Sequence, residues 1–342
     1  MSLDPIRLTR QLIDIPSLTG DELAVEELVA SLLRERGFAV EEQNVGPTRR
    51  NLFATAGGTP RIVFCSHLDT VPPFIGSSED EESVYGRGAC DAKGIIAAML
   101  AAGDRLAADG IRDFGFLFVV GEETDSAGAK EANGFFAGRG SEVVIVGEPT
   151  ESRFVRASKG ALTATIRFEG IAAHSAYPEK GDSAIRRLAG AIEAIYAASW
   201  GDDGDLGRGI PNVGVVRGGE KPNVIAPWAE ADCIFRIVEP LPDALSRLQS
   251  IVGPLGGTIA RHHGNDPVRM VWPAGRATVV VGFNTDAPHL PKIGRPILFG
   301  PGSILDAHTA GEKVAKRELL TAVETYRKLA ADLITGAVQI DG

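Results

Sequence analysis

The sequence predicts an α/β protein whose mainly parallel central sheet is interrupted by an inserted α+β module. Apolar runs at Arg61–Ser66, Phe114–Gly121 and Glu142–Gly147 are uninterrupted, which is typical of strands buried on both faces of a parallel sheet. From Ala161–Glu169 onward, apolar and polar residues alternate, as in an antiparallel strand with one exposed face. The length of 342 residues suits about two domains.

Helical segments separate the apolar strands in the first half of the chain. We expect helices over Asp4–Asp14 and Gly20–Arg36, the second closed by Gly37. A third helix is expected over Ile95–Ala108, between two of the apolar runs. Strands that alternate with helices in this way indicate a sheet with helices on both sides.

The inserted module has strands and helices in the order βαββαβ. The elements that follow its first strand are expected at Ser183–Ala198, Asn212–Arg217, Ala229–Val238, Pro242–Val252 and Thr258–Arg261. We therefore assign residues 158–264 to an insertion within a domain formed by residues 1–157 and 265–342.

The α/β pattern returns after the insertion. Arg295–Phe299 is expected to be a strand and Glu312–Ile334 a long terminal helix. Thr309 and Glu312 have the spacing of a capping box, and Gly336 is placed to end the helix.

Composition excludes several classes of function. The net charge of −10 provides no basic surface for nucleic acid or an anionic membrane. No apolar run approaches the roughly 18 residues of a membrane span, and the N-terminus has no signal-peptide pattern. Three widely spaced cysteines argue against a disulfide framework or a zinc finger. We expect a cytoplasmic protein.

Potential metal ligands follow the predicted strands of the first domain. The carboxyl ends of parallel strands meet at one edge of the sheet, where ligands bind. The histidines and carboxylates expected at this edge are His67, Asp69, Asp91, Glu122, Glu123, Glu148 and His308. So many carboxylates would repel one another without a cation, and histidine with carboxylate suits zinc or a similar ion. Asp69 lies two residues after His67 and could hold its far ring nitrogen.

Each residue also has a structural interpretation. His67 could pack in the core, the Glu122–Glu123 pair could be a solvated strand end, and Glu148 could belong to a turn before Pro149. Asp91 could cap the helix that follows it. Their convergence on one edge favours a metal site, and two metals with a bridging carboxylate and water are an arrangement used for hydrolysis.

The motifs resemble the M20 metallopeptidase family, which includes acetylornithine deacetylase, succinyl-diaminopimelate desuccinylase, aminoacylase and glutamate carboxypeptidases. The matching segments, in chain order, are Ser66–Pro72, Gly86–Gly94, Gly121–Thr124, Gly147–Thr150 and Ala307–Thr309. The resemblance covers essentially the whole chain and implies a zinc-peptidase-type catalytic domain with an inserted lid or dimerisation domain.

The resemblance also implies roles for the residues at the sheet edge. Asp91 would bridge two divalent metal ions, which we expect to be zinc, with cobalt or manganese as alternatives. His67 and Glu148 would complete one metal site, and Glu123 and His308 the other. Glu122 would be the general base that acts on the bridging water. The peptide bond after Asp91 is cis in the family.

Further roles follow for the insertion and for one loop. His174 would polarise the substrate carbonyl, often from the partner chain of a dimer. Asn223 and Arg236 would bind the substrate carboxylate, and Gly302 and Ser303 belong to a substrate-binding loop. His262, His263 and His289 are interpreted as structural or solvent-exposed.

The predicted function is hydrolysis of the amide bond of an N-acyl-L-amino acid, as in acetylornithine deacetylase, by a homodimer that forms through the lid. A desuccinylase and a small-peptide carboxypeptidase or dipeptidase are the alternatives. A non-catalytic metal-binding homologue would be expected to have lost a ligand or the base, yet all are present. A dinuclear phosphoesterase would need more basic residues than Arg87 and Lys93 provide.

Overall fold

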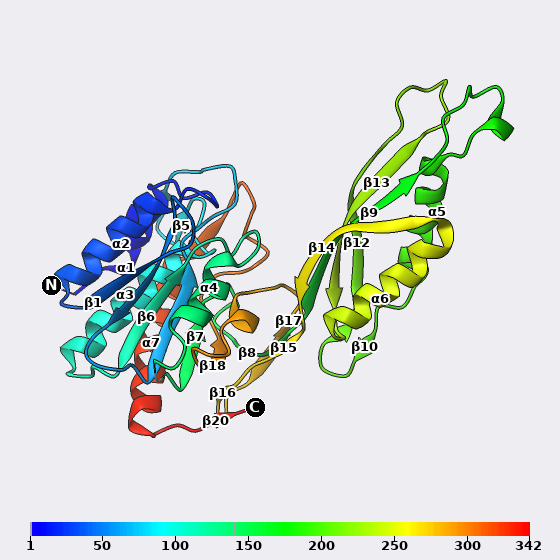
Figure 1. The fold of residues 1–342 in the computed structure, drawn as a ribbon. Coiled ribbons are helices and arrows are strands. Elements are labelled where there is room, and N and C mark those ends of the chain that lie inside the picture. The colour runs from blue at the N-terminus through cyan, green and yellow to red at the C-terminus, as the bar shows by residue number, and fades with distance from the viewer. Residues whose placement is uncertain (1, 140) are drawn as a thin grey trace. The chain divides into compact units, whose positions relative to one another are not determined.

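The computed structural model describes residues 2–139 and 141–342, which fold into two units. Unit 1 comprises the described residues up to Arg156 together with Arg269–Val279 and Thr285–Gly342. Unit 2 comprises Ala157–Val268 and Val280–Asn284. The insertion expected at 158–264 therefore omitted residue 157, residues 265–268 and the returning segment at 280–284, which are too short to show a period in the sequence. Each unit is described separately below (Figure 1).

Unit 1 contains a mixed, mostly parallel sheet, which confirms the predicted fold class. Its strand order is β1-β2-β6-β3-β7-β18-β8, and β8 also pairs with β15 (Val268–Arg269) and β17 (Thr278–Val281). The strands are β1 (Ala39–Asn44), β2 (Arg50–Thr55), β3 (Ile62–His67), β6 (Phe114–Val119), β7 (Val143–Val146), β8 (Phe154–Ser158) and β18 (Arg295–Leu298). The pairs β6–β3, β3–β7 and β7–β18 are parallel, whereas β1, β2 and β8 pair antiparallel.

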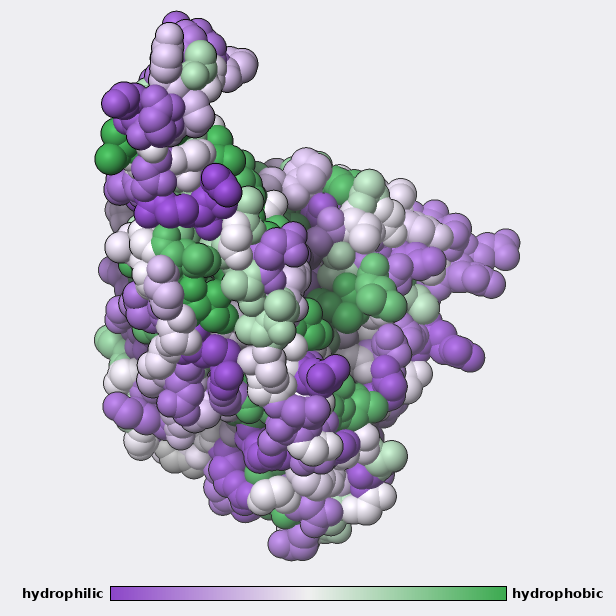
Figure 2. Space-filling model, turned by 90° about the vertical axis from the view of Figure 1, so that its right-hand side faces the viewer, coloured by the Kyte–Doolittle hydropathy of each residue, from purple (hydrophilic) through white to green (hydrophobic). Residues whose placement is uncertain are grey.

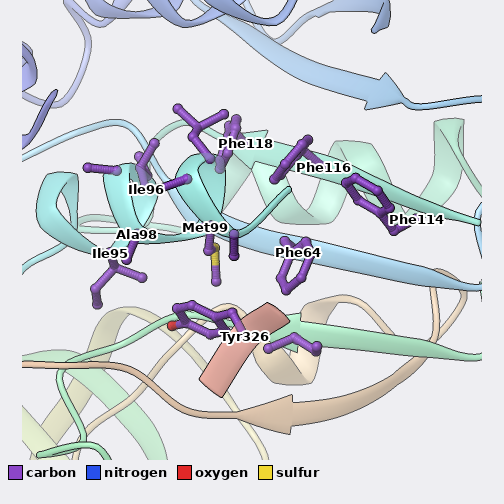
Figure 3. Close-up of a cluster of buried hydrophobic side chains, with 14 of the residues drawn as sticks. Phe64, Ile95, Ile96, Ala98, Met99, Phe114, Phe116, Phe118 and Tyr326 are labelled. Atoms are coloured by element: carbon purple, nitrogen blue, oxygen red, sulfur yellow. The ribbon is translucent and has the colours of Figure 1, made fainter. Parts of the chain in front are cut away.

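Helices cover both faces of this sheet. They are α1 (Pro5–Ile13), α2 (Leu23–Glu35), α3 (Lys93–Ala108), α4 (Ala127–Phe135) and α7 (Lys316–Thr335). Phe64, Phe116 and Tyr326 meet in the core between the sheet, α3 and α7 (Figure 3). Successive strand residues face opposite sides, and on the other side Phe53 stacks on Phe136, just after α4, with ring centroids 4.7 Å apart.

Three predicted helix starts are wrong by two residues or more. The second helix begins at Leu23 and not at Gly20, the third at Lys93 and not at Ile95, and the last at Lys316 and not at Glu312. Lys313–Ala315 forms β19, which pairs with β5 (Ser83–Tyr85), so the proposed capping box does not exist. This pairing joins segments far apart in the chain, and local spacing could not reveal it. Gly336 does end α7, with φ of 75°.

Unit 2 is a four-stranded antiparallel sheet with two helices, in the predicted βαββαβ order. The sheet order is β12-β13-β9-β14. Its elements are β9 (Gly160–Glu169), α5 (Ala184–Ala197), β12 (Ile210–Gly218), β13 (Trp228–Ile237), α6 (Leu241–Val252) and β14 (Gly257–Asn265). The small hairpin β10–β11 (Asp202–Asp203, Gly207–Arg208) was not expected. Burial alternates strictly along β13, because one face carries α5 and α6 (Figure 1).

The remaining elements are short. They are β4 (Ser78–Glu79), β15 (Val268–Arg269), β16 (Trp272–Pro273), β17 (Thr278–Val281), β20 (Ile340–Asp341) and the 3₁₀ turns η1 (Pro178–Lys180), η2 (Gly253–Leu255) and η3 (Ala287–His289). Within residues 2–139 and 141–342, no helix is both long and apolar enough to cross a membrane.

Candidate metal centre

Three parallel strands of unit 1 carry potential ligands to the same edge of the sheet. His67 is the last residue of β3, Glu122 and Glu123 follow the end of β6, and Glu148 follows the end of β7. The register of β3 pairs His67 with Val119, the last residue of β6. The position predicted for these residues from the strand pattern therefore agrees with the structure.

Asp91 lies at the centre of the group. Its Oδ1 is 3.0 Å from Nε2 of His67, and its Oδ2 is 3.3 Å from Nε2 of His308. The Asp91–Ala92 peptide bond is cis, as the resemblance implied. Asp91 is not the helix cap, because Ala92 occupies the N-cap position of α3 and, among the described residues, no side chain caps that helix end.

His308 reaches the group from the loop after β18. Its Nε2 is 3.0 Å from Oε1 and Oε2 of Glu123. The ligand atoms of His67, Asp91 and Glu123 lie within 4.8 Å of one another. His308 has a φ of 63°, and its side chain is 48% exposed, whereas that of Glu123 is 6% exposed. Four of the five residues assigned to the two metal sites thus lie together, and Glu148 follows β7 at the same edge of the sheet.

Asp69 organises the loop that carries the two glutamates. Its Oδ1 accepts hydrogen bonds from the backbone N–H groups of Gly121 and Glu122 at 2.9 and 3.1 Å, and its Oδ2 accepts from Glu123 at 3.2 Å. The nearest acceptor for Nδ1 of His67 is the backbone carbonyl of Asp69 at 3.0 Å, and the carboxylate is farther away at 3.6 Å. Asp69 therefore orients both the imidazole and the following loop.

The histidines in this group bind protons strongly. Burial opposes the charged form of His67, but hydrogen bonds to Asp69 and Asp91 outweigh it and raise the pKa of His67 well above its ordinary value. Hydrogen bonds to Asp91 and Glu123 raise the pKa of His308 to about 10. Burial works against the ionised form of Asp91, yet its hydrogen bonds to His308 and His67 lower its pKa.

The three glutamates, unlike Asp91, have raised pKa values. Burial raises the pKa of Glu122 well above its ordinary value, and the charge of Glu148 adds to the effect. Burial also raises the pKa values of Glu148 and Glu123. Carboxylates this crowded are hard to ionise together without added positive charge.

Asp286 is a further carboxylate at this site that the sequence did not reveal. It is buried, and burial raises its pKa to about 6, with Asp69 among the charges that act on it. Its Oδ1 has no hydrogen-bond partner among the described residues. Asp286 lies just before the short η3 turn and does not directly follow a strand of the sheet. The rule that placed ligands at the carboxyl ends of strands could therefore not find it.

The donor set fits divalent metal ions. Two imidazole nitrogens and several carboxylate oxygens are the ligands that zinc takes in hydrolytic sites. Added positive charge would stabilise Glu122 and Glu148 in their ionised forms and would compete with the protons that His67 and His308 bind.

Gly302 and Ser303, predicted to bind substrate, have protein partners here. The Gly302 N–H donates to Glu318 at 3.2 Å, and the Ser303 hydroxyl donates to Glu151 at 3.2 Å. Gly302 has a φ of 83°, and a Cβ on it would lie 2.5 Å from that of Cys90, so the position requires glycine. The loop is therefore packed beside the residue that precedes Asp91.

Unit 2 brings two of its three predicted site residues together. His174 forms a bridge with Val224, next to Asn223, and both His174 and Asn223 are exposed. Arg236 lies eight residues along β13 from Trp228, the strand's first residue, which is about 26 Å at the usual rise of about 3.3 Å per residue. The loops of His174 and Asn223 adjoin the Trp228 end of the sheet. One copy of unit 2 therefore does not gather all three residues.

The fold and the ligand group define a metal-dependent hydrolase, and comparison with known proteins places it in a family. Residues 156–256 match the peptidase dimerisation domain of M20 proteins. A peptidase M20 domain-containing protein of Schizosaccharomyces pombe is 34% identical over 335 residues, covering 95% of this chain and 83% of the relative. The chain belongs to the M20 peptidase family.

Two other similar proteins are named carboxypeptidases. A probable carboxypeptidase of Aspergillus flavus is 35% identical over 366 residues, covering 94% of this chain and 85% of the relative. The crystal structure of an M20 family metallo-carboxypeptidase from Sulfolobus solfataricus has a TM-score of 0.76 at 13% identity and covers 96% of this chain and 98% of that one, which shows the shared fold. These names favour the peptidase alternative over the acetylornithine deacetylase interpretation.

Proposed function

We propose that this chain is a metal-dependent carboxypeptidase, which hydrolyses the amide bond before the C-terminal residue of a short peptide. The observation that carries the proposal is the convergence of His67, Asp91 and Glu123 within 4.8 Å, with His308 in contact with both carboxylates. The relatives named carboxypeptidases support this substrate class.

The proposed ligand set accommodates two metal ions. Asp91 would be shared, because its two oxygens face different histidines. His67 and Glu148 would hold one ion, and Glu123 and His308 the other. When bound, such ions polarise the scissile carbonyl and lower the pKa of a water molecule to about 7.

Glu122 is the proposed general base. It is adjacent to the proposed ligand Glu123. Its backbone N–H donates a hydrogen bond of 3.1 Å to Oδ1 of Asp69, which fixes the backbone at this position. Its carboxylate takes a proton from the attacking water as the oxygen bonds to the carbonyl carbon. The proton then passes to the amine nitrogen as the C–N bond breaks, which returns Glu122 to its ionised form.

His174 is the proposed donor to the carbonyl oxygen. Its Nδ1 accepts a hydrogen bond from the backbone N–H of Ala176 at 3.1 Å. In the neutral ring the proton is then on Nε2, which is free to donate to the oxyanion of the transition state.

A homodimer through unit 2 is part of the proposal. The edge strand β12 exposes Ile210, Val215 and Val216, and apolar patches interrupt the hydrophilic surface in Figure 2. Two copies could also supply His174 and Arg236 to one site, although these residues lie at opposite ends of the sheet in one copy. The match to a peptidase dimerisation domain supports this arrangement.

A substrate panel tests the function. Amine release would be measured with Zn²⁺ or Co²⁺ on dipeptides and tripeptides, the same peptides with amidated C-termini, and N-acetyl- and N-succinyl-amino acids. The proposal predicts cleavage of peptides with a free C-terminal carboxylate and loss of cleavage on amidation. Turnover of the N-acyl-amino acids alone would replace the carboxypeptidase with the deacylase alternative.

A further inference from the structure

A buried ion pair between Arg87 and Glu312 lies beside the metal centre. Arg87 is 2% exposed and Glu312 is 1% exposed, and Nη1 of Arg87 donates to Oε2 of Glu312 over 2.5 Å. The loss of hydration makes a buried ion pair a poor source of stability compared with an apolar pair of the same size. Its place in the fold points to another role.

The second oxygen of Glu312 gathers backbone groups of the Asp91 loop. Oε1 accepts hydrogen bonds from the N–H groups of Gly88 at 2.9 Å and of Cys90 and Asp91 at 3.3 Å each. Gly88 has a φ of 92°, and a Cβ there would lie 2.8 Å from the side chain of Lys93, so this turn requires glycine. Glu312 thus fixes the backbone that presents the central carboxylate.

The same pair also anchors the His308 loop. Nη1 of Arg87 donates to the carbonyl oxygen of Thr309 at 3.2 Å, and the Gly86 N–H donates to the carbonyl oxygen of Glu312 at 3.0 Å. Thr309 directly follows His308, whose side chain is about half exposed and so has little packing to hold it. The Arg87–Glu312 pair therefore ties together two loops that approach the centre from distant parts of the sequence.

We propose that Arg87 and Glu312 are positioning residues that hold Asp91 and His308 in register for metal binding. The inference rests on the metal-binding part of the proposed function and not on the substrate. Ligands that are already held in the binding geometry bind the metal more tightly, because their side chains and backbone lose less conformational entropy when the metal binds. Loss of such supporting groups typically weakens metal affinity about 10–100-fold.

The Glu312→Gln variant tests the proposal, with Glu26→Gln as the matched control. Glu26 is also a buried glutamate, paired with Arg50 at 2.7 Å, but it lies on α2. Dissociation constants for Zn²⁺ and Co²⁺ would be measured by competition with a chelator, together with the visible spectrum of the Co²⁺ form and thermal unfolding of the metal-free proteins. We expect Glu312→Gln to raise the Kd about 10–100-fold and to alter the Co²⁺ spectrum, and Glu26→Gln to change only the unfolding temperature.

An unchanged Kd and spectrum in folded Glu312→Gln would overturn the proposal. If that variant does not fold, Arg87→Lys tests the pair from its other side, since lysine keeps the charge but cannot contact both Glu312 and Thr309 as the guanidinium does. An unchanged Kd in Arg87→Lys would then overturn it. A wild-type protein that binds metal but hydrolyses no amide would contradict the proposed function and leave the positioning role intact.

Discussion

The two units bury their sheets in different ways, and their candidate site residues differ accordingly. In unit 1, every residue of β3, β6 and β7 is buried, and His67 and Glu148 are buried at the ends of these strands. In unit 2, β13 alternates between buried and partly exposed residues, and His174 is exposed in a loop at one end of the sheet. Unit 1 thus holds its charged site residues in buried positions, whereas unit 2 exposes its site residues to solvent.

We infer from this contrast that the two units have different roles. In unit 1, the carboxylates of Asp69 and Glu312 accept hydrogen bonds from the backbone N–H groups of Glu122 and Asp91 and so fix that backbone. In unit 2, His174 is held by contacts within its own unit. Its ring accepts a hydrogen bond from the Ala176 N–H, and its backbone forms a bridge with Val224. Substitutions in unit 1 should therefore affect metal binding or proton transfer, and those in unit 2 should affect turnover or assembly without changing the metal site.

The largest expected effect is that of Glu122→Gln. Removing the general base should reduce kcat about 10²–10⁴-fold and leave metal affinity nearly unchanged, because the five proposed ligands remain. The matched control is Glu131→Gln, an exposed glutamate on α4. Steady-state kinetics with metal titration would check this, and a folded, metal-loaded Glu122→Gln variant with full activity would contradict the assigned role.

His174→Ala tests the contribution of unit 2. Loss of a donor to the oxyanion should lower kcat about 10²-fold while the metal Kd and the unfolding temperature stay at wild-type values. His263→Ala, an exposed histidine on β14, should have wild-type kinetics. If both variants behave alike, His174 does not take part in turnover.

Val216→Lys tests assembly through the edge of unit 2. Val216 is 55% exposed on β12, and a charge there should oppose association, so sedimentation should show the mass halved. Thr258→Lys on the opposite edge strand β14 is the control and should remain dimeric. A wild-type monomer with full activity would rule out the proposed dimer.

The smallest expected effect concerns the metal-free protein and pH. The pKa of His308 is raised to about 10 and that of Glu148 is also raised, so at these two groups the folded state binds more protons than the unfolded state. The stability that His308 contributes is fully present below about pH 6.5 and is lost as the pH rises through about 10. The unfolding temperature of the metal-free protein should therefore fall by a few degrees between pH 6.5 and 10.

Bound metal should weaken this dependence, since it replaces the protons on His67 and His308. Differential scanning calorimetry with and without Zn²⁺ across this range would measure both effects. If the unfolding temperature of the metal-free protein rose between pH 6.5 and 10, the predicted direction of the pH dependence would be wrong.

Much of the candidate metal site could be predicted from the sequence, because strand patterns are local features of the chain. A strand's apolar run locates its carboxyl end, so His67, Glu123 and Glu148 could be placed at one edge before the fold was known. Glu312 was misread as part of a helix cap because its actual partners, Arg87 and the Asp91 loop, are more than 200 residues away in the chain. Asp286 was missed for a similar reason, since only the tertiary fold brings its turn to the site.

The most direct test of the account is the metal stoichiometry of the purified protein, measured by titrating metal-free wild type with Zn²⁺ in a calorimeter. We predict two ions per chain in wild type, with His308→Ala losing one of them and His262→Ala, which changes an exposed histidine on β14, keeping both. Binding of no ion by wild type, or two ions with unchanged affinity in His308→Ala, would contradict the proposal that unit 1 is built around a dinuclear centre.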